Sequence, residues 1–248
     1  MSKAKKYITC QKNDRIGMQI YSRLWTAYFA EQEGFEYIHT PLKDPYESVF
    51  NLGAKFHNIR EKDLNEVTIF NKQTNYTPII KRGLFADFSG KLIQSIIKNY
   101  TPPENIIQQG NQTNICIHVR RGDTVNDESK KCKAVSYRTC STENLKNILD
   151  YIHHYISHPL TINIHTDGNI NLSDLNTHGM SINVYDRNTS ELTAINDMIL
   201  CDILFPSGIS SFSGIAGIYN KNTVISRSNG IYDNLYIQKN RKYITELS

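Results

Sequence analysis

Stretches in which apolar and polar residues alternate recur along the whole chain, and they predict short β-strands. The clearest lies at 114–119, where Ile115, Ile117 and Val119 occupy every second position, so one face of this strand is expected to be buried. Further strands are expected at 6–10, 35–39, 66–70, 160–165, 181–185, 202–205 and 223–226.

Between these strands, apolar residues recur at helical spacing. Gly34 is expected to end the first helix as its C-cap, and Thr142 to begin the third as its N-cap. Because strands and helices alternate, we predict an α/β fold with mainly parallel sheets. The helices are expected at 18–33, 88–99, from Thr142 to before Pro159, at 189–201 and at 213–219.

A boundary between two domains is expected near residue 110. The segment Thr101-Pro-Pro-Glu and the polar run that begins at Gln108 interrupt the pattern of strands and helices. With 248 residues, the chain has enough material for two compact domains. We therefore predict domains at 1–110 and 111–248.

A dense polar cluster, Arg120-Arg-Gly-Asp, follows the strand at 114–119. Ligands of open α/β sheets bind at the carboxyl ends of strands, so this is a candidate binding site. His118 and Arg120 share one face, about 7 Å apart by strand rise, while Arg121 points elsewhere. A guanidinium can grip a phosphate through two parallel donors, and an imidazole nearby can bond the base or sugar of the same nucleotide. The alternative is a strand end capped by a surface Arg–Asp ion pair.

A second candidate site lies at 206–217, where Pro-Ser-Gly-Ile-Ser-Ser-Phe-Ser-Gly-Ile-Ala-Gly joins a strand to a helix. Free amides at a helix N-terminus bind anions, and the hydroxyls of Ser210, Ser211 and Ser213 add donors. The alternative is an ordinary capped helix. Two such sites at the ends of separate strands are expected to converge on one crevice.

The segment 118–123, His-Val-Arg-Arg-Gly-Asp, resembles the His-x-Arg-Arg-x-Asp motif of the α1,2- and α1,6-fucosyltransferases and the protein O-fucosyltransferases. Asp197, followed by an apolar run, a strand and Ser-Ser-Phe-Ser at 210–213, is similar to a second motif of this superfamily. The resemblance covers essentially 114–226. A fainter match near the N-terminus has Met18 where several families have Asn.

This resemblance implies a GT-B-like glycosyltransferase, with two Rossmann-like domains that face each other across a cleft. It implies inverting, metal-independent transfer of fucose from GDP-fucose to a hydroxyl of a glycan or protein acceptor, with the donor on 111–248 and the acceptor on the side of 1–110. The implied donor contacts are His118 and Asp197 at the guanine or ribose, Arg120 at the β-phosphate, Arg121 elsewhere in the donor site, and Ser210, Ser211, Phe212 and Ser213 at the diphosphate.

The chemistry of the expected reaction assigns further roles. A carboxylate can accept the two adjacent N–H donors of guanine, which suits Asp197 to select that base; the alternative is a solvated helix residue. Arg120 is expected to stabilise the charge that gathers on the leaving diphosphate, so no cofactor or metal is required, and the chain has no Asp-x-Asp metal signature. Asp123 and Glu128 are candidate bases for the acceptor hydroxyl, and Asp123 alternatively pairs with Arg121.

The composition narrows the partners. The net charge of +4 and pI near 8.7 suit an anionic ligand, but the basic clusters are short, so nucleic acid is not expected. Residues 1–10 contain no apolar stretch long enough for a signal peptide or membrane anchor, which predicts a cytoplasmic enzyme or the soluble part of a secretory-pathway enzyme. The rival functions are a GT-B enzyme with another nucleotide sugar and a non-catalytic nucleotide- or glycan-binding module.

The five cysteines lack metal-site spacing. Cys116 and Cys201 are expected in the core. Cys132 and Cys140 are expected to be reduced, with a disulfide as the alternative in an oxidising compartment. Three histidines are expected on a helix surface rather than at a metal, namely His153, His154 and His158.

Overall fold

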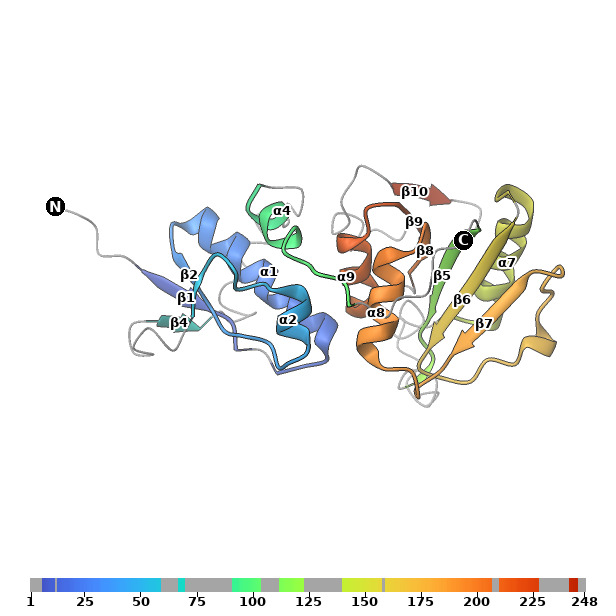
Figure 1. Cartoon of the computed structure of the whole chain (residues 1–248), viewed down its shortest axis with the longest axis horizontal. Coiled ribbons are helices and arrows are strands. Elements are labelled where there is room, and N and C mark those ends of the chain that lie inside the picture. Colours follow the sequence, from blue (N-terminus) through green and yellow to red (C-terminus); the bar gives the residue numbers. More distant parts are fainter. Residues whose placement is uncertain are drawn as a thin grey trace. The chain divides into compact units, whose positions relative to one another are not determined.

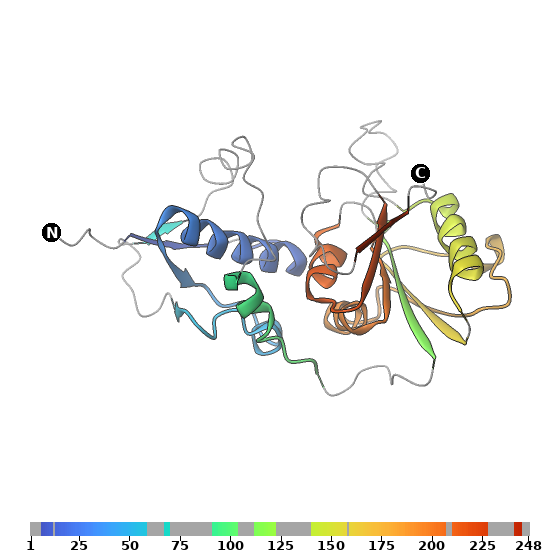
Figure 2. The ribbon, with the colours of Figure 1, turned by 90° about the horizontal axis from the view of Figure 1, so that it is seen from above.

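The chain divides into two compact units, Met1–Pro103 and Glu104–Ser248, called here the first and the second unit. The sequence pattern predicts this boundary near 110. In each unit the described strands form one sheet with helices packed on it (Figures 1 and 2). The computed structural model describes residues 6–11, 13–58, 67–69, 91–103, 112–122, 140–157, 159–206, 210–227 and 241–244.

The first unit contains a parallel sheet whose described strands lie in the order β3-β2-β1-β4. Its elements are β1 (Tyr7–Thr9), α1 (Ile16–Glu33), β2 (Glu36–His39), α2 (Tyr46–Phe50), β3 (His57–Asn58), β4 (Val67–Ile69) and α4 (Lys91–Ile97). The parallel pairing confirms the prediction from alternating strands and helices. Neither α2 nor β3 is predicted, because 5 and 2 residues are too few to give a periodic pattern.

The helix α1 forms the centre of the core of the first unit. Twelve of its 18 residues are buried, which is more than one stripe, because β1, β2 and α4 all pack against it. Trp25 is 1% exposed and contacts Tyr21 and Tyr28 edge to face. Gly34 ends the helix with a φ of 73°, the left-handed conformation that glycine adopts at little cost, which confirms the expected C-cap.

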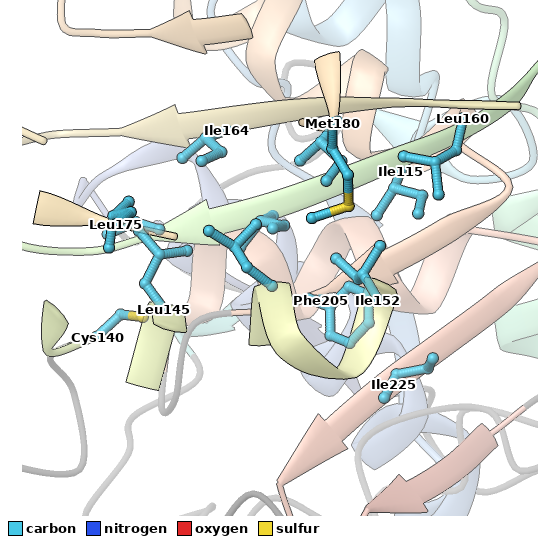
Figure 3. Close-up of a cluster of buried hydrophobic side chains, with 14 residues drawn as sticks. Ile115, Cys140, Leu145, Ile152, Leu160, Ile164, Leu175, Met180, Phe205 and Ile225 are labelled. Carbon is cyan, nitrogen blue, oxygen red and sulfur yellow. The ribbon is translucent and has the colours of Figure 1, made fainter. Parts of the chain in front are cut away.

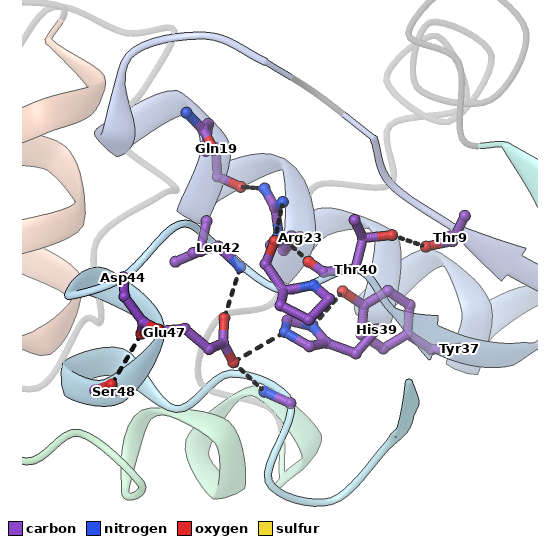
Figure 4. A network of polar contacts seen from close by, with 12 residues as sticks. Thr9, Gln19, Arg23, Tyr37, His39, Thr40, Leu42, Asp44, Glu47 and Ser48 are labelled. Atoms are coloured by element: carbon purple, nitrogen blue, oxygen red, sulfur yellow. Dashed lines mark hydrogen bonds and ion pairs between the residues drawn. The ribbon is translucent and has the colours of Figure 1, made fainter. Parts of the chain in front are cut away.

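The carboxylate of Glu47 in α2 holds the segments around that helix in place (Figure 4). Its Oε1 lies 3.0 Å from His39 Nε2 and accepts from the amide of Gly53 at 3.3 Å, while Oε2 accepts from the amide of Leu42 at 2.7 Å. The Nδ1 atom of His39 lies 3.2 Å from the Tyr37 hydroxyl. A Cβ on Gly53 would come within 2.3 Å of the His39 ring, so only glycine fits there. One carboxylate thus ties the end of β2 to the segments before and after α2.

Arg23 secures the same region from α1 (Figure 4). The residue is 3% exposed, and its guanidinium donates to the backbone carbonyls of Thr40 at 2.7 Å, Gln19 at 3.1 Å and Pro41 at 3.3 Å. A buried guanidinium is tolerated only when its donors are paired, as they are here. The turn after β2 is therefore fixed from both α1 and α2.

The second unit contains a parallel sheet whose described strands lie in the order β10-β9-β8-β5-β6-β7. Its elements are β5 (Thr113–Val119), α7 (Thr142–Tyr155), β6 (Leu160–Thr166), η4 (Leu172–Asp174), β7 (Ser181–Tyr185), α8 (Glu191–Leu200), β8 (Ile203–Phe205), α9 (Ser211–Tyr219), β9 (Thr223–Arg227) and β10 (Arg241–Ile244). From β5 the chain moves outward to β7, returns to the other side of β5 at β8 and continues to β10. This is the doubly wound order of a Rossmann fold, and it reverses between β5 and β8.

Two helix starts in the second unit differ from the prediction. Ser141, not Thr142, caps α7, because its side chain accepts from the amide of Asn144 at 3.0 Å. The hydroxyl of Thr142 instead accepts from Arg121 at 3.0 Å. The helix α9 begins at Ser211 rather than 213, so the serine-rich segment forms its first turn.

The main apolar core of the second unit lies between the sheet and α7, whereas α8 and α9 cover the opposite face (Figures 1 and 3). From β5 it receives Ile115, Ile117 and Val119, all 0% exposed, as the alternating pattern predicts. Ile148 and Ile156, expected in the apolar stripe of α7, are only partly buried. The fully buried part of the stripe consists of Leu145, Leu149 and Ile152.

The opposite face of β5, β6 and β7 carries polar side chains. The amide of Asn163, which is 0% exposed, donates to Asn114 Oδ1 at 2.7 Å and accepts from Asn183 Nδ2 at 3.0 Å. These three side chains, called here the asparagine ladder, satisfy the buried amide from both neighbouring strands. Cys116 lies on this face and is buried, as is Cys201, which confirms that both are core thiols.

The remaining cysteine and histidine predictions have mixed outcomes. Cys140 is a buried thiol, while Cys132 lies outside the described residues. His153 and His154 are exposed on α7, as expected, and His158 is outside the described residues. Within the described ranges, no helix has both the length and the apolar character that crossing a membrane requires.

We expect Glu47→Gln to destabilise the first unit by about 1–2 kcal/mol, the lower part of the range for hydrogen bonds to a charged group, because the side chain is partly exposed. Urea unfolding followed by the fluorescence of Trp25, the single tryptophan, measures this loss. Ser48→Ala is the control, since it removes an exposed hydrogen bond to Asp44 from the same helix.

The effect of Glu47→Gln should depend on pH. Burial alone would raise the pKa of Glu47, but the hydrogen bond and charge of His39 and the amides of Leu42 and Gly53 lower it overall. Its contribution is therefore present above the ordinary value of 4.5 and is lost as the pH falls through the lowered value in the folded state. A difference between parent and variant that persists unchanged into this acidic range would contradict the assignment.

Candidate functional site

Three aromatic side chains form a row near the carboxyl-terminal edge of the second sheet. His118 of β5 pairs in register with His165 of β6, which pairs with Tyr185 of β7, so the three side chains lie side by side on one face. The rings of His165 and Tyr185 stack, with centroids 5.0 Å apart and planes at 16°. His118 and His165 are 7% and 2% exposed, and Tyr185 is half-buried.

Asp197 of α8 lies against this row. Its carboxylate is 2% exposed, and Oδ2 lies 3.3 Å from Nε2 of His165. Its backbone carbonyl accepts from the Cys116 thiol at 3.4 Å and from the amide of Cys201 at 3.0 Å, which fixes this turn of the helix against β5. The alternative interpretation of Asp197 as a solvated helix residue is therefore wrong.

The first turn of α9 lies beside His118. The ring of Phe212 has its centroid 5.7 Å from that of His118. Ser210 and Ser213 are 6% and 0% exposed, Ser211 is half-buried, and the Oγ atom of Ser213 has no hydrogen-bond partner among the described residues. The first amides of a helix have no partner within the helix and favour anions. The structure thus brings residues of both sequence motifs together around His118.

The two consecutive arginines after β5 have different surroundings. The guanidinium of Arg121 donates to Cys140 O at 3.2 Å, to Asn169 O at 3.1 Å and to Thr142 Oγ1 at 3.0 Å. These bonds connect the end of β5 to the start of α7 and to the loop after β6. Arg120 is half-buried and follows His118 by two positions. Arg121 therefore stabilises this edge of the sheet, and its expected contact with a ligand stays a prediction.

Asp167, directly after β6, holds the loop that contains both arginines. Its Oδ1 accepts from the backbone amides of Arg121 at 2.6 Å and Gly122 at 2.8 Å. A Cβ on Gly122 would lie 2.7 Å from the Asp167 carbonyl oxygen and 2.9 Å from the guanidinium of Arg187, so a side chain does not fit. Arg187 also donates to the Asp167 carbonyl. The loop is fixed by protein contacts at each of these points.

Four residues at this edge of the sheet have no role that the sequence alone predicts. They follow or end the strands β6 and β7, so the rule that was applied to the end of β5 would have found them. What the sequence does not show is which strands are neighbours. The four residues are His165, Asp167, Tyr185 and Arg187.

Burial lowers the pKa of His118 to about 3; Asp167 opposes this shift, while His165 and Arg120 add to it. The imidazole is therefore neutral at neutral pH, with one nitrogen that donates and one that accepts. Its Nδ1 atom is buried and has no hydrogen-bond partner among the described residues. Such a group suits a base or sugar better than a phosphate.

Two parts of the predicted site lie outside the described residues. They are the candidate bases Asp123 and Glu128 and the segment 207–209 of the serine-rich stretch, so the role of Asp123 stays a prediction. Within the described ranges, no group of three or more His, Cys, Asp or Glu side chains could hold a metal ion.

The architecture of the whole chain is similar to that of solved GT-B glycosyltransferases. It is similar to POFUT1, a protein O-fucosyltransferase, in complex with GDP-fucose, with a TM-score of 0.55, 11% identity, and coverage of 88% of this chain and 95% of that chain. For POFUT1 in complex with GDP, the TM-score is 0.53 at 10% identity, with the same coverage. No protein-family model and no curated protein sequence matches the chain. At these identities the likeness shows the fold, which confirms the GT-B-like α/β class.

The lowered pKa of His118 should make the second unit sensitive to acid. Between the ordinary value of 6.5 and the folded value of about 3, the unfolded chain binds a proton that the folded chain does not. The free energy of unfolding should therefore decrease as the pH decreases, by up to about 1.4 kcal/mol per pH unit from this group. His118→Asn cannot be protonated and should lose less stability between about pH 6.5 and 4.5.

Urea unfolding of the second unit, followed by circular dichroism at several pH values, tests this expectation. The matched control is His154→Asn, which replaces an exposed histidine on α7 and should retain the acid sensitivity of the parent. Equal sensitivity in the parent and in His118→Asn would show that His118 does not exclude the proton.

Proposed function

We propose that the protein is an inverting fucosyltransferase that transfers fucose from GDP-fucose to a hydroxyl of a glycan or protein acceptor. The observation that carries this proposal is the meeting of two motifs at the reversal point of the second sheet. The His118 ring contacts Phe212 at 5.7 Å, and the neighbouring His165 contacts Asp197 at 3.3 Å. Reversal points of doubly wound sheets are the usual sites of nucleotides.

The similar fold of POFUT1 supports the choice of donor. POFUT1 was crystallised with GDP-fucose and with GDP, and its likeness to this protein extends over 88% of the chain. By analogy, the second unit binds the donor and the first unit faces the acceptor.

The guanine is assigned to Asp197. A carboxylate with two acceptor oxygens matches the adjacent N1–H and N2–H donors of guanine, and its burial strengthens hydrogen bonds by excluding water. The neutral ring of His118, whose Nδ1 lacks a described partner, is assigned to the ribose or base. These two contacts favour a guanine nucleoside over an adenine or uracil nucleoside.

The diphosphate is assigned to Arg120 and the start of α9. The buried Ser213 hydroxyl, which has no described partner, and the first amides of α9 supply neutral donors, while Arg120 supplies positive charge. As the C1–O bond to the phosphate breaks, these groups stabilise the charge on the leaving oxygen. We therefore propose that the transfer requires no divalent metal.

The acceptor oxygen would bond to C1 on the face opposite the departing diphosphate, and its proton would pass to a base. Asp123 is the residue that we propose for this step, because it directly follows Gly122 in the sequence motif that contains His118 and Arg120. The products are the fucosylated acceptor and GDP.

Calorimetric titration of the purified protein with GDP, GDP-fucose, GDP-mannose and UDP, in the presence of EDTA, tests the donor assignment. We expect GDP and GDP-fucose to bind and UDP to bind at least about tenfold more weakly, since UDP lacks the paired N–H donors. Equal binding of UDP, or no nucleotide binding, would contradict the proposal.

The same titration, together with assays of donor hydrolysis and fucosyl transfer, separates the rival functions. A preference for GDP-mannose over GDP-fucose would indicate a GT-B enzyme with another donor. Binding of GDP-fucose without hydrolysis or transfer to any glycan or protein acceptor would indicate a non-catalytic module. Activity that disappears in EDTA and returns with a divalent cation would contradict metal independence.

Substitution of Arg120 and of Arg121 by alanine should have different effects. Arg120→Ala should lower turnover by about 100-fold or more, because it removes charge stabilisation from the transition state. Arg121→Ala should lower the stability of the second unit by about 2–4 kcal/mol, because it removes three hydrogen bonds from one guanidinium. Fucosyl transfer and thermal unfolding are measured for both variants, and turnover of Arg120→Ala equal to that of the parent would refute the catalytic assignment.

A further inference from the structure

The carboxylate of Asp197 has one polar side-chain contact within the described residues. It is 2% exposed, and its Oδ2 lies 3.3 Å from Nε2 of His165. A buried carboxylate is costly unless a partner compensates its charge or orients donors toward it. Whatever Asp197 binds, His165 is the side chain placed to set the direction of its two oxygens.

The ring of His165 is itself held firmly. Its backbone lies in the middle strand of three, paired with His118 on one side and Tyr185 on the other, and its ring stacks on that of Tyr185 at 5.0 Å. The Nδ1 and Nε2 atoms are both buried, and neither forms a hydrogen bond in the described part of the chain. Packing therefore fixes the ring, and its one polar contact there is with the carboxylate of Asp197.

We propose that His165 is a positioning residue for base selection. Its Nε2–H orients the carboxylate of Asp197 so that both oxygens meet the two adjacent N–H groups of guanine. The inference rests on the proposed function, which assigns guanine to Asp197. His165 does not touch the base and acts through the carboxylate.

The length of the contact agrees with this role. A fully formed charge-assisted hydrogen bond measures about 2.7–2.9 Å, and the contact here is 3.3 Å. Contacts of this kind tighten when the ligand engages. Neither Nε2 of His165 nor Oδ2 of Asp197 forms a hydrogen bond among the described residues, so both atoms keep the capacity to bond when the base is bound.

A residue that positions the carboxylate should affect the preference for guanine over other bases more than the overall affinity for nucleotides. IDP differs from GDP only in lacking the 2-amino group, so the ratio of the two affinities measures whether both carboxylate oxygens are aligned. We expect the parent to prefer GDP over IDP by about 10–100-fold, the value of one hydrogen bond to a charged group. Asp197→Asn gives the ratio that corresponds to complete loss.

Two substitutions distinguish the effect of the Nε2–H group of His165 from the effect of the shape of its ring. His165→Phe keeps the ring and its stack on Tyr185 but removes the Nε2–H donor. His165→Gln loses the ring but carries an amide nitrogen near the position of Nε2. We expect the ratio to fall to within about threefold of unity for His165→Phe, and to stay within about threefold of the parent ratio for His165→Gln.

The control is His178→Phe. His178 also contacts an aspartate, Asp150, at 2.6 Å, but it precedes β7 and so belongs to the opposite edge of the sheet. This variant should bind both nucleotides as the parent does. Calorimetric titration of the full chain with GDP and with IDP provides all the affinities, and circular dichroism checks that each variant is folded.

The outcomes are distinct. The inference is supported if His165→Phe loses selectivity and His165→Gln retains it, and it is overturned if His165→Phe retains the parent ratio or His165→Gln loses it. If His165→Phe does not fold, His165→Asn replaces it, because its amide lies near the position of Nδ1 and cannot reach Asp197. If the parent binds GDP without preference over IDP, both this inference and the guanine assignment are overturned. If the parent prefers GDP but the His165 variants contradict the inference, the proposed function remains intact.

Discussion

The second unit depends on the way in which β5 pairs with its two neighbours. Along β6 the pairing covers seven residues, Thr113 to Val119, but along β8 it covers only three and ends where Ile117 meets Phe205. The last residues of β5 therefore have a strand on one side only in the described sheet. The first turn of α9 lies beside this end, through the contact of Phe212 with His118. The reversal of strand order thus creates a place where a helix start and a strand end supply donors together.

The start of the loop after β5, residues 120–122, is organised before any ligand is present. Asp167 accepts two of its amides, and Arg121 directs three donors into neighbouring segments. The conformational cost of ordering the loop is met by folding, so a ligand at Arg120 need not supply it. The guanidinium of Arg121 is thereby used for structure.

Much of this arrangement follows from local sequence. Period-2 and helical patterns locate the long elements, and the C-cap at Gly34 and the burial of Ile115 and its neighbours agree with expectation. The short elements α2 and β3 are not predicted, because they have too few residues to show a period. The choice of Ser141 over Thr142 as cap depends on Arg121, which is distant in sequence.

The partners of the site are the part that local pattern cannot supply. Pairing between strands is non-local, so the sequence does not show that His165 lies next to His118, or that Asp167 reaches the amides of the arginine loop. The same limit explains why the sequence separates Arg120 from Arg121 only by the face of the strand and does not show the partners of Arg121. Their difference depends on where carbonyl groups of Cys140 and Asn169 lie in space.

The asparagine ladder has a consequence for the site that lies beyond it. Asn163 is two residues before His165, and Asn183 is two residues before Tyr185, so each amide lies about 7 Å along its strand from an aromatic ring. If β6 slipped by one residue against β7, the amide of Asn163 would turn to the apolar face, and a slip of two would separate it from Asn183 by about the same 7 Å. The pair Asn163–Asn183 therefore helps to fix the register of β6 against β7, in which the rings of His165 and Tyr185 stand level.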